Sequence, residues 1–588
     1  MTNGGPQMQH IRLGRLLAVC LAMACLVVLG IGSALLVHVD SRPIKFGQAT
    51  LFAASTASHE ITTPIALGAG GAIRIQRGTI QLAPTSAQRR TGDPVDVPPQ
   101  DGSASLIIDG GVFHIAGGGL ADDIRAANEL SPFEQALRTV NFERVAIHRG
   151  TVRVHLPSGH AETLTNVAAE VTVRRKSSLS IRGTGTLRGQ EISFDIAGPS
   201  LLDRRPNANR ALKVAVKSPF LDISFDGRLG ATDTMRLQGQ ADISTSNLRH
   251  TARWLGAGWP AGPGLREMRL RGDVDWQAPA LAFDKASFQI DGNEATGTLA
   301  LGFNAPRPSL SGTLAFQTLN LSPYLEPELK AQIASLLPWF GDDDGEIPLP
   351  LGRQIDADIR LSASRVLLPG LETGRFAAAV SLREGRLLAD IAEINIDGGR
   401  GSGQLTADLN DRDSRLSIRG RIEGIEAERA STLLLGHSVV TGTSTITADL
   451  SAGGNTVSEL VRGLRGKATL SLREGGRLGI DIKSLMGAAQ KSKVEGWELA
   501  TRGQTSIDGL EAKFRVDKGI VASEHVEATV GDSLLKAVGT ISLASRQLDL
   551  RLLLDAAPAA AARAQVAIPP DILLFQGPWS ASSIQIER

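Results

Sequence analysis

The stretch IDADIRLSA, from Ile355 to Ala363, has an apolar residue at every second position. One face carries Ile355, Ala357, Ile359 and Leu361, and the other carries Asp356, Asp358 and Arg360. Successive side chains of a β-strand point to opposite sides, so this alternation predicts a strand with one buried face. The stretches QLDLRLLLD (547–555) and TITADL (445–450) repeat the pattern. Such strands are typical of antiparallel sheets with one apolar face.

A longer phrase recurs along the chain. It appears as QIDGNEATGTLAL from Gln289, NIDGGRGSGQLTADL from Asn395 and TVGDSLLKAVGTISL from Thr529. Each copy has a strand, a turn rich in Gly, Asp or Asn, a second glycine and another alternating strand. The pattern predicts hairpins repeated along an extended sheet, with the apolar residues of each copy on the same side.

Short helices are expected between these hairpins. The stretch from Ser131 to Val140 opens with a serine cap, a proline and a glutamate three residues after the cap, and the stretch from Ser322 to Leu337 opens similarly. Shorter candidates are SNLRHTARWLG (246–256), NTVSELVRGLRG (455–466) and IKSLMGAAQ (482–490). We interpret residues 84–103 as a loop and residues 341–352 as a connector between two sheet sections.

The composition excludes several classes of protein. The chain has 588 residues, enough for more than one unit, and its formal net charge is +1, which gives a nucleic-acid partner no electrostatic support. Aromatic residues make up 4%, with the one tyrosine at Tyr324, so the aromatic girdles of an outer-membrane barrel cannot be built. Both cysteines, Cys20 and Cys25, lie in the N-terminal apolar run. The remaining sequence therefore offers no disulfide or thiolate metal site.

The segment from Leu16 to Val37 is uncharged and apolar apart from one serine. As a helix it reaches about 33 Å, enough to cross a bilayer core. It exceeds the usual length of a signal-peptide core, so we expect an uncleaved transmembrane anchor at 16–37. The preceding tail, residues 1–15, carries Arg12 and Arg15 without any acid, which favours a cytoplasmic tail and a large domain on the other side.

No motif supplies an active site. The acidic run from Asp342 to Glu346 lacks the ligand spacing of an EF-hand, and we interpret it as a solvated turn rather than a calcium site. His148, His155 and His160 have no carboxylate or cysteine at zinc-like spacing. The glycine-rich stretches 463–469 and 398–403 lack the Walker and nucleophile-elbow spacings. We therefore expect a protein that is not an enzyme and uses no cofactor or metal.

The apolar face of the predicted sheet cannot remain in water. Either the sheet fills its interior with its own side chains, or it keeps an open groove for acyl chains. The sequence leaves both alternatives open, because a lining of Ala, Val, Leu and Ile suits either. The candidates for a lipid-groove lining are Leu470, Leu472, Leu548, Leu550, Leu552 and Leu554.

The stretch TVSELVRGLRGKATLSLREGGRLGIDIKSLMGAAQ, residues 456–490, resembles the C-terminal region of the AsmA family. The positions that fall on the family pattern are Gly466, Gly475, Gly479, Ile480 and Asp481, and Ile482 stands where the family usually has leucine. Residues 145–173 resemble the family's N-terminal repeat. The resemblance covers roughly residues 140–588, and residues 45–140 depart from it.

The resemblance implies an inner-membrane anchor with a β-rich body in the periplasm. AsmA-like proteins are similar to bridge-like lipid carriers, whose curved sheet forms an apolar groove for phospholipid transport and outer-membrane assembly. The expected fold is therefore mostly β: a long curved antiparallel sheet forming an open β-groove, with short capping helices and one N-terminal transmembrane helix. Residues 45–340 and 351–588 are the expected N-terminal and C-terminal AsmA-like regions.

We expect the chain to hold or conduct phospholipid from the inner membrane. The alternative is a non-catalytic envelope scaffold with a filled β core and envelope proteins as partners.

Overall fold

The computed structural model describes most of the chain between Ser58 and Glu587. The residues outside this description are 1–57, 61–64, 68–72, 76–78, 85–102, 117–140, 156–160, 175–177, 200–210, 230–235, 257–261, 278–279, 303–306, 326–354, 370, 409–413, 429–439, 473–474, 490–493, 496–502, 532, 557–570, 579–581 and 588. The predicted anchor 16–37, the helix at 131–140 and the acidic turn at 342–346 lie outside it. Within the described ranges, no helix is long and apolar enough to cross a membrane.

The chain divides into two compact units. Unit 1 runs to Gly258 and includes Leu265–Ile290 and Thr298–Pro308; unit 2 contains Trp259–Gly264, Asp291–Gly297 and the chain from Ser309 onward. Strand β16 (Asn293–Gly302) has residues in both units. Both units are mostly β, as the alternating pattern predicts.

Unit 1 contains one described helix, α4 (Leu248–Trp254), and fifteen described strands. The strands are β1 (Ser58–Glu60), β2 (Ile65–Leu67), β3 (Ile73–Ile75), β4 (Thr79–Pro84), β5 (Ser103–Asp109), β6 (Val112–Ala116), β7 (Asn141–His155), β8 (Ala161–Arg174), β9 (Ser178–Leu187), β10 (Gln190–Pro199), β11 (Ala211–Lys217), β12 (Leu221–Leu229), β13 (Arg236–Thr245), β14 (Met268–Gln277) and β15 (Ala280–Ile290). From β7 to β15 each strand pairs antiparallel with the next. β5 and β6 instead pair with β7 in parallel, which the hairpin pattern did not predict.

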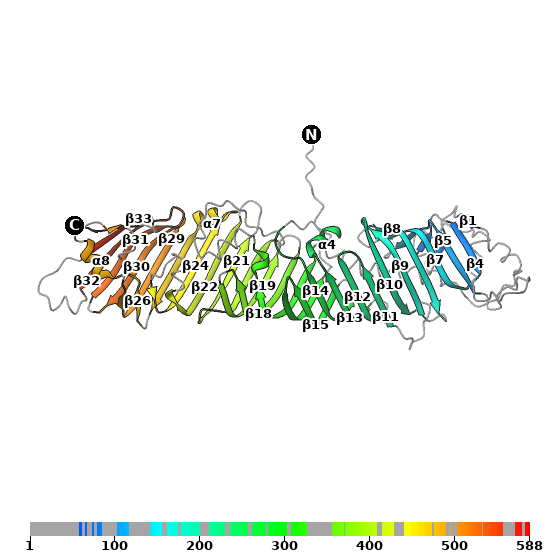
Figure 1. Ribbon diagram of the computed structural model, residues 1–588, viewed down its shortest axis with the longest axis horizontal. Helices are drawn as coiled ribbons and strands as arrows, with labels where there is room; N and C mark the ends of the chain where they lie inside the picture. Colours follow the sequence, from blue (N-terminus) through cyan, green and yellow to red (C-terminus); the bar gives the residue numbers. More distant parts are fainter. Residues whose placement is uncertain are drawn as a thin grey trace, which may run out of the picture. The chain divides into compact units, whose positions relative to one another are not determined.

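The described elements that lie wholly in unit 2 start with β17 (Ser309–Asn320) and the 3₁₀ turn η3 (Ser322–Tyr324). Its main ladder continues through β18 (Asp356–Leu368), β19 (Leu371–Arg383), β20 (Arg386–Ile396), β21 (Gly399–Asp408), β22 (Arg415–Glu426), β24 (Thr443–Gly453), β25 (Arg465–Leu472), β29 (Gly509–Asp517), β30 (Ile520–Val530), β31 (Ser533–Ser542), β32 (Gln547–Ala556), β33 (Asp571–Pro578) and β34 (Ser583–Glu587). Figure 1 shows β18, β19, β21, β22 and β24 in one row of this ladder. These neighbours are antiparallel, but β17 and β18 are parallel. A parallel pair needs a long crossover, and residues 321–355 provide one.

The smaller elements of unit 2 lie between strands of this ladder. Helix α7 (Val457–Gly463) connects β24 to β25. A second sheet contains β23 (Val440–Thr441), β26 (Gly476–Leu478) and β28 (Thr505–Ile507). Helix α8 (Ile482–Ala489) and the two-residue strand β27 (Val494–Glu495) complete the unit.

The predicted hairpins are confirmed at their turns. Between β20 and β21 the turn residues Asp397 and Gly398 have φ angles of 47° and 82°, as a two-residue type I′ turn requires. The second glycine of the phrase has a different cause. A Cβ on Gly403 would lie 2.5 Å from the carbonyl oxygen of Arg419 on β22, and the carbonyl of Asp549 blocks Gly539 in the same way. Glycine therefore permits the neighbouring backbone to approach closely.

The three short helix candidates are also confirmed. Asn247 caps α4 by accepting a hydrogen bond from the His250 amide at 2.9 Å, and Thr456 caps α7 from the Glu459 amide at 3.2 Å. Asp481 does the same for α8 through the Ser484 amide at 3.0 Å. Each cap satisfies an amide that the first turn of a helix leaves without a partner.

Candidate functional site

One face of the main sheet in unit 2 is aliphatic from strand to strand; we call it the aliphatic face. Ala389, Leu405, Ile418 and Leu450 stand directly opposite one another on β20, β21, β22 and β24. A second row four residues along contains Ile422, Ile446, Leu470 and Ala512. Paired residues share a face, so the two rows form continuous apolar lanes across the strands.

The row between these two lanes is made of small residues. Gly403, Gly420, Ala448 and Ala468 pair in sequence across β21, β22, β24 and β25. The flanking rows lie four residues apart along each strand, or about 13 Å between Cα atoms. The aliphatic face therefore has a shallow central strip bordered by Leu and Ile side chains.

Exposure distinguishes part of this face from an ordinary core. Ile418 has 47% of its surface exposed, although its register neighbours are aliphatic. Leu405 and Leu450 beside it, and Ile422 and Ile446 in the next row, are only partly buried. We call the aliphatic face of β21, β22 and β24 the open section. Ile418 together with its partly buried neighbours leaves apolar surface accessible on these three strands.

Unit 1 shows the opposite behaviour. One row of paired apolar residues crosses β8 to β12, and its members are only 1% to 4% exposed. The row consists of Val171, Ile181, Ile196, Val214 and Phe225. In β12 buried and exposed residues alternate, except that Gly227 is only partly buried. The apolar face of β12 is therefore filled by the chain itself.

The opposite face of the unit 2 sheet is charged. Beside Ile418, the guanidinium of Arg419 lies 2.9 Å from the Asp449 carboxylate on β24. The ammonium of Lys513 lies 2.7 Å from Glu511 on β29, and its hydrogen bond lowers the pKa of that carboxyl. Both pairs are exposed, so they contribute little stability and mainly keep this face in water.

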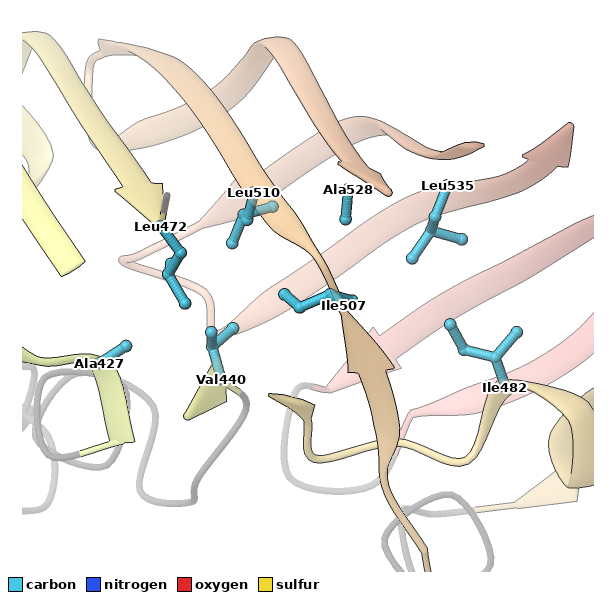
Figure 2. Close-up of a cluster of buried hydrophobic side chains, with 8 residues drawn as sticks. All are labelled: Ala427, Val440, Leu472, Ile482, Ile507, Leu510, Ala528 and Leu535. Carbon is cyan, nitrogen blue, oxygen red and sulfur yellow. The ribbon is translucent and has the colours of Figure 1, made fainter. Parts of the chain in front are cut away.

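A second layer covers the aliphatic face farther along the sheet. It consists of α8 and the three strands β23, β26 and β28, and we call it the cap. Val440, Ile482 and Ile507 of the cap point toward Leu472 of β25, Leu510 of β29, Ala528 of β30 and Leu535 of β31 (Figure 2). Farther along, Leu485 and Ala489 of α8 pack with Leu548, Leu573, Phe575 and Ile584. The aliphatic face beneath the cap is a dry core.

The described residues provide no metal centre. No three or more His, Cys, Asp or Glu side chains in that part of the chain are grouped so that they could hold an ion. His148 and His155 both lie on β7, whereas His160 and the acidic run at 342–346 lie outside the described ranges.

The sequence of this region matches a known family. The AsmA family model matches residues 346–526, from just before β18 into β30. Residues 346–526 belong to the AsmA family. The AsmA region contains the open section and the whole cap, so the predicted resemblance is confirmed there. No curated protein and no solved structure matches the chain significantly.

The predicted lining residues all lie on the aliphatic face, but under the cap. Leu470 and Leu472 are on β25 in the AsmA region; Leu548, Leu550, Leu552 and Leu554 are on β32, beyond it. Leu472 is 2% exposed and Leu548 is 7% exposed, and the other four are partly buried against the two clusters. These leucines contact the chain's own side chains.

The residues of the open section were not singled out from the sequence. Ile418 and Ile422 belong to the stretch RLSIRGRIEG (415–424), which alternates as clearly as the leucine-rich strands. The alternation in this stretch therefore predicts which of its residues lie on the aliphatic face. It carried no information about which part the cap covers, because the cap comes from a later segment.

Proposed function

We propose that this chain is a non-catalytic, inner-membrane-anchored envelope protein that holds phospholipid acyl chains on the open section. The observation that carries the proposal is Ile418, 47% exposed within a paired row of aliphatic residues in the AsmA region. Family membership supports a lipid-associated envelope role, and the predicted anchor at 16–37 supports a periplasmic position for the body. The role would support outer-membrane biogenesis.

The chemistry of the open section suits an alkyl chain. Each CH₂ that leaves water contributes about 0.8 kcal/mol, and the side chains around Ile418 offer this contact without any charged group on the same face. The central strip of glycine and alanine provides room between the flanking rows. Because successive rows offer equivalent contacts, a chain could slide along them without a large barrier.

A filled scaffold is the second candidate, and unit 1 favours it. Its apolar row from Val171 to Phe225 is fully buried, so that unit behaves as a structural body. In this alternative the open section would bind a protein of the envelope rather than lipid. The two candidates differ in what contacts Ile418 in the cell.

Photocrosslinking of the full chain distinguishes them. A benzophenone amino acid replaces Ile418 in cells of a Gram-negative host, and irradiated protein is analysed by mass spectrometry for attached phospholipid. Leu388 is the matched control, because it is 38% exposed but lies on the charged face, opposite Ser381 and Thr406. We expect phospholipid adducts at 418 and few at 388. Protein adducts alone at 418 would support the scaffold and reject the lipid role.

A further inference from the structure

The cap is an excursion from a sheet that is continuous without it. Strands β25 and β29 pair directly, from Gly466 with Val516 to Leu472 with Leu510. Apart from β23, the cap elements β26, α8 and β28 lie in the chain between Leu472 of β25 and the start of β29, together with β27, which pairs with β34 of the main sheet. The main ladder therefore does not need the cap in order to form.

The contacts between the cap and the sheet are apolar. Ile482, Leu485 and Ile507 make them, and they are 4%, 0% and 3% exposed. Within the described chain, the side-chain hydrogen bonds of cap residues stay inside the cap. They join Asp481 to Ser484 and Thr505 to the Ile480 carbonyl, and they link Arg477 to Gln504. The side chains that this layer packs against the sheet are aliphatic, so they offer the sheet the same chemistry as an alkyl chain.

The surface under the cap continues the open section. The row of Ile422 and Ile446 leads directly to Leu470 and Ala512, and Ala512 pairs with Val526 on β30. Leu470 and Val526 pack against the cap cluster. A single apolar lane thus runs from the partly buried Ile422 and Ile446 of the open section to Leu470 and Val526, which the cap contacts.

The attachment points of the cap are narrow. Gly442 links β23 to β24, and Gly475 lies between β25 and β26, with φ angles of 124° and 70°. The Asp508 amide donates to the Thr529 carbonyl at 2.9 Å near the return to the sheet. At the far side, β27 pairs with β34 through two residues, Val494 with Ile584 and Glu495 with Ser583. These are small connections for a segment that covers several strands.

We propose that the cap is a displaceable lid that takes the place of acyl chains on the aliphatic face. When it lifts, lipid held on the open section can advance onto β25 and the strands beyond. This inference rests on the proposed lipid-holding role of the open section. It assigns Leu470 and Leu552 to the part of the face that lipid reaches only when the lid is open.

A disulfide lock tests the lid in the full chain. Cys20 and Cys25 are replaced by alanine, and Glu495→Cys with Ser583→Cys joins the paired backbones of β27 and β34, where antiparallel neighbours have suitable Cα separations. The benzophenone amino acid is placed at Leu552, which packs against both clusters, or at Ile418 in a parallel sample. The probe is the cell's own phospholipid, detected by mass spectrometry.

We expect phospholipid adducts at 552 in the reduced protein and at least a fivefold loss after oxidation, reversed by a thiol reductant. Adducts at 418 should not change with oxidation. Equal yields at 552 in both states would overturn the lid. Adducts at 418 with none at 552 in either state would also reject it, while leaving the lipid-holding role intact. The absence of adducts at 418 would reject the proposed function itself.

Hydrogen exchange provides a measurement that needs no substitution. The Leu485 amide, which donates to the Asp481 carbonyl in α8, should exchange at least tenfold faster than the amides of the β25–β29 ladder. Lid opening without sheet opening produces this difference. Equal exchange in α8 and in the ladder would show that the cap and the sheet open together, against the proposal.

Discussion

Two alanine substitutions on the same face should have very different costs. Leu472 is 2% exposed in the cluster beneath the cap, whereas Ile418 is 47% exposed in the open section. Leu472→Ala removes a core side chain and leaves a cavity, which costs about 2–5 kcal/mol. Full burial of an isoleucine is worth about 1.5–3 kcal/mol, and Ile418 achieves roughly half of that, so Ile418→Ala should cost about 1 kcal/mol. No cavity cost is added, because water can fill the vacated space.

Urea denaturation of the full chain in detergent, followed by far-UV circular dichroism, measures both free energies of unfolding. Leu388→Ala is the control for a large exposed side chain on the charged face, and we expect its effect to stay within about 0.5 kcal/mol. A loss for Ile418→Ala as large as that for Leu472→Ala would show that the open section is enclosed. The argument for lipid binding would then fail.

Three further outcomes follow from the same geometry. Ile418→Asp should leave the circular dichroism spectrum unchanged and reduce co-purified phospholipid several-fold by mass spectrometry; unchanged lipid content would contradict the role of the open section. Gly403→Val should destabilise the protein by about 1–3 kcal/mol in urea denaturation, because its Cβ would lie 2.5 Å from the Arg419 carbonyl oxygen. Gly398→Ala should cost less, because its Cβ would meet nothing within 4 Å and only its positive φ angle disfavours a side chain. The Ser484 hydroxyl and the Ser484 amide both donate hydrogen bonds to the Asp481 carboxylate, which holds the pKa of Asp481 below its ordinary value of 3.8. The stabilisation of α8 by Asp481 should therefore be complete above pH 3.8 and should disappear as the pH falls below that value. The melting temperatures of wild type and Asp481→Ala should accordingly differ at pH 6 and converge as the pH approaches 2. A difference that stays constant with pH would refute the role of Asp481 as the N-cap of α8.

The strand pattern was predictable from the sequence because its cause is local. Alternation in IDADIRLSA fixes which residues of β18 share a face, and Asp397-Gly398 fixes a two-residue turn. Asn247 and Thr456, the N-cap residues of helices α4 and α7, likewise bind amides within the first turn of their own helix. Such features depend on a few neighbouring residues, so a single sequence contains them.

The parallel pairs and the extent of the cap were not predictable in this way. β17 and β18 carry the same alternation whichever direction they run, and only the long connection between them hints at parallel pairing. Leu472 and Ile418 have similar strand contexts, yet Ile507 packs against Leu472, whereas Ile418 is 47% exposed and belongs to no cluster of the described residues. Burial on a sheet face is decided by segments distant in sequence. The leucine-rich strand β32 was therefore predicted as a lipid-groove lining, whereas the residues of the open section were not.

The parallel junction between β17 and β18 sets a minimum length for the segment that links them. Residues 321–355 must travel from the end of β17 to the start of β18, and a strand of 12 residues, the length of β17, spans about 40 Å. The linking segment could extend to about 115 Å at ~3.3 Å per residue, nearly three times the distance. Deletions of up to roughly half of it should therefore be geometrically tolerated, whereas reduction to a hairpin length would reverse the direction of β18. The direction of every later strand depends on this one link.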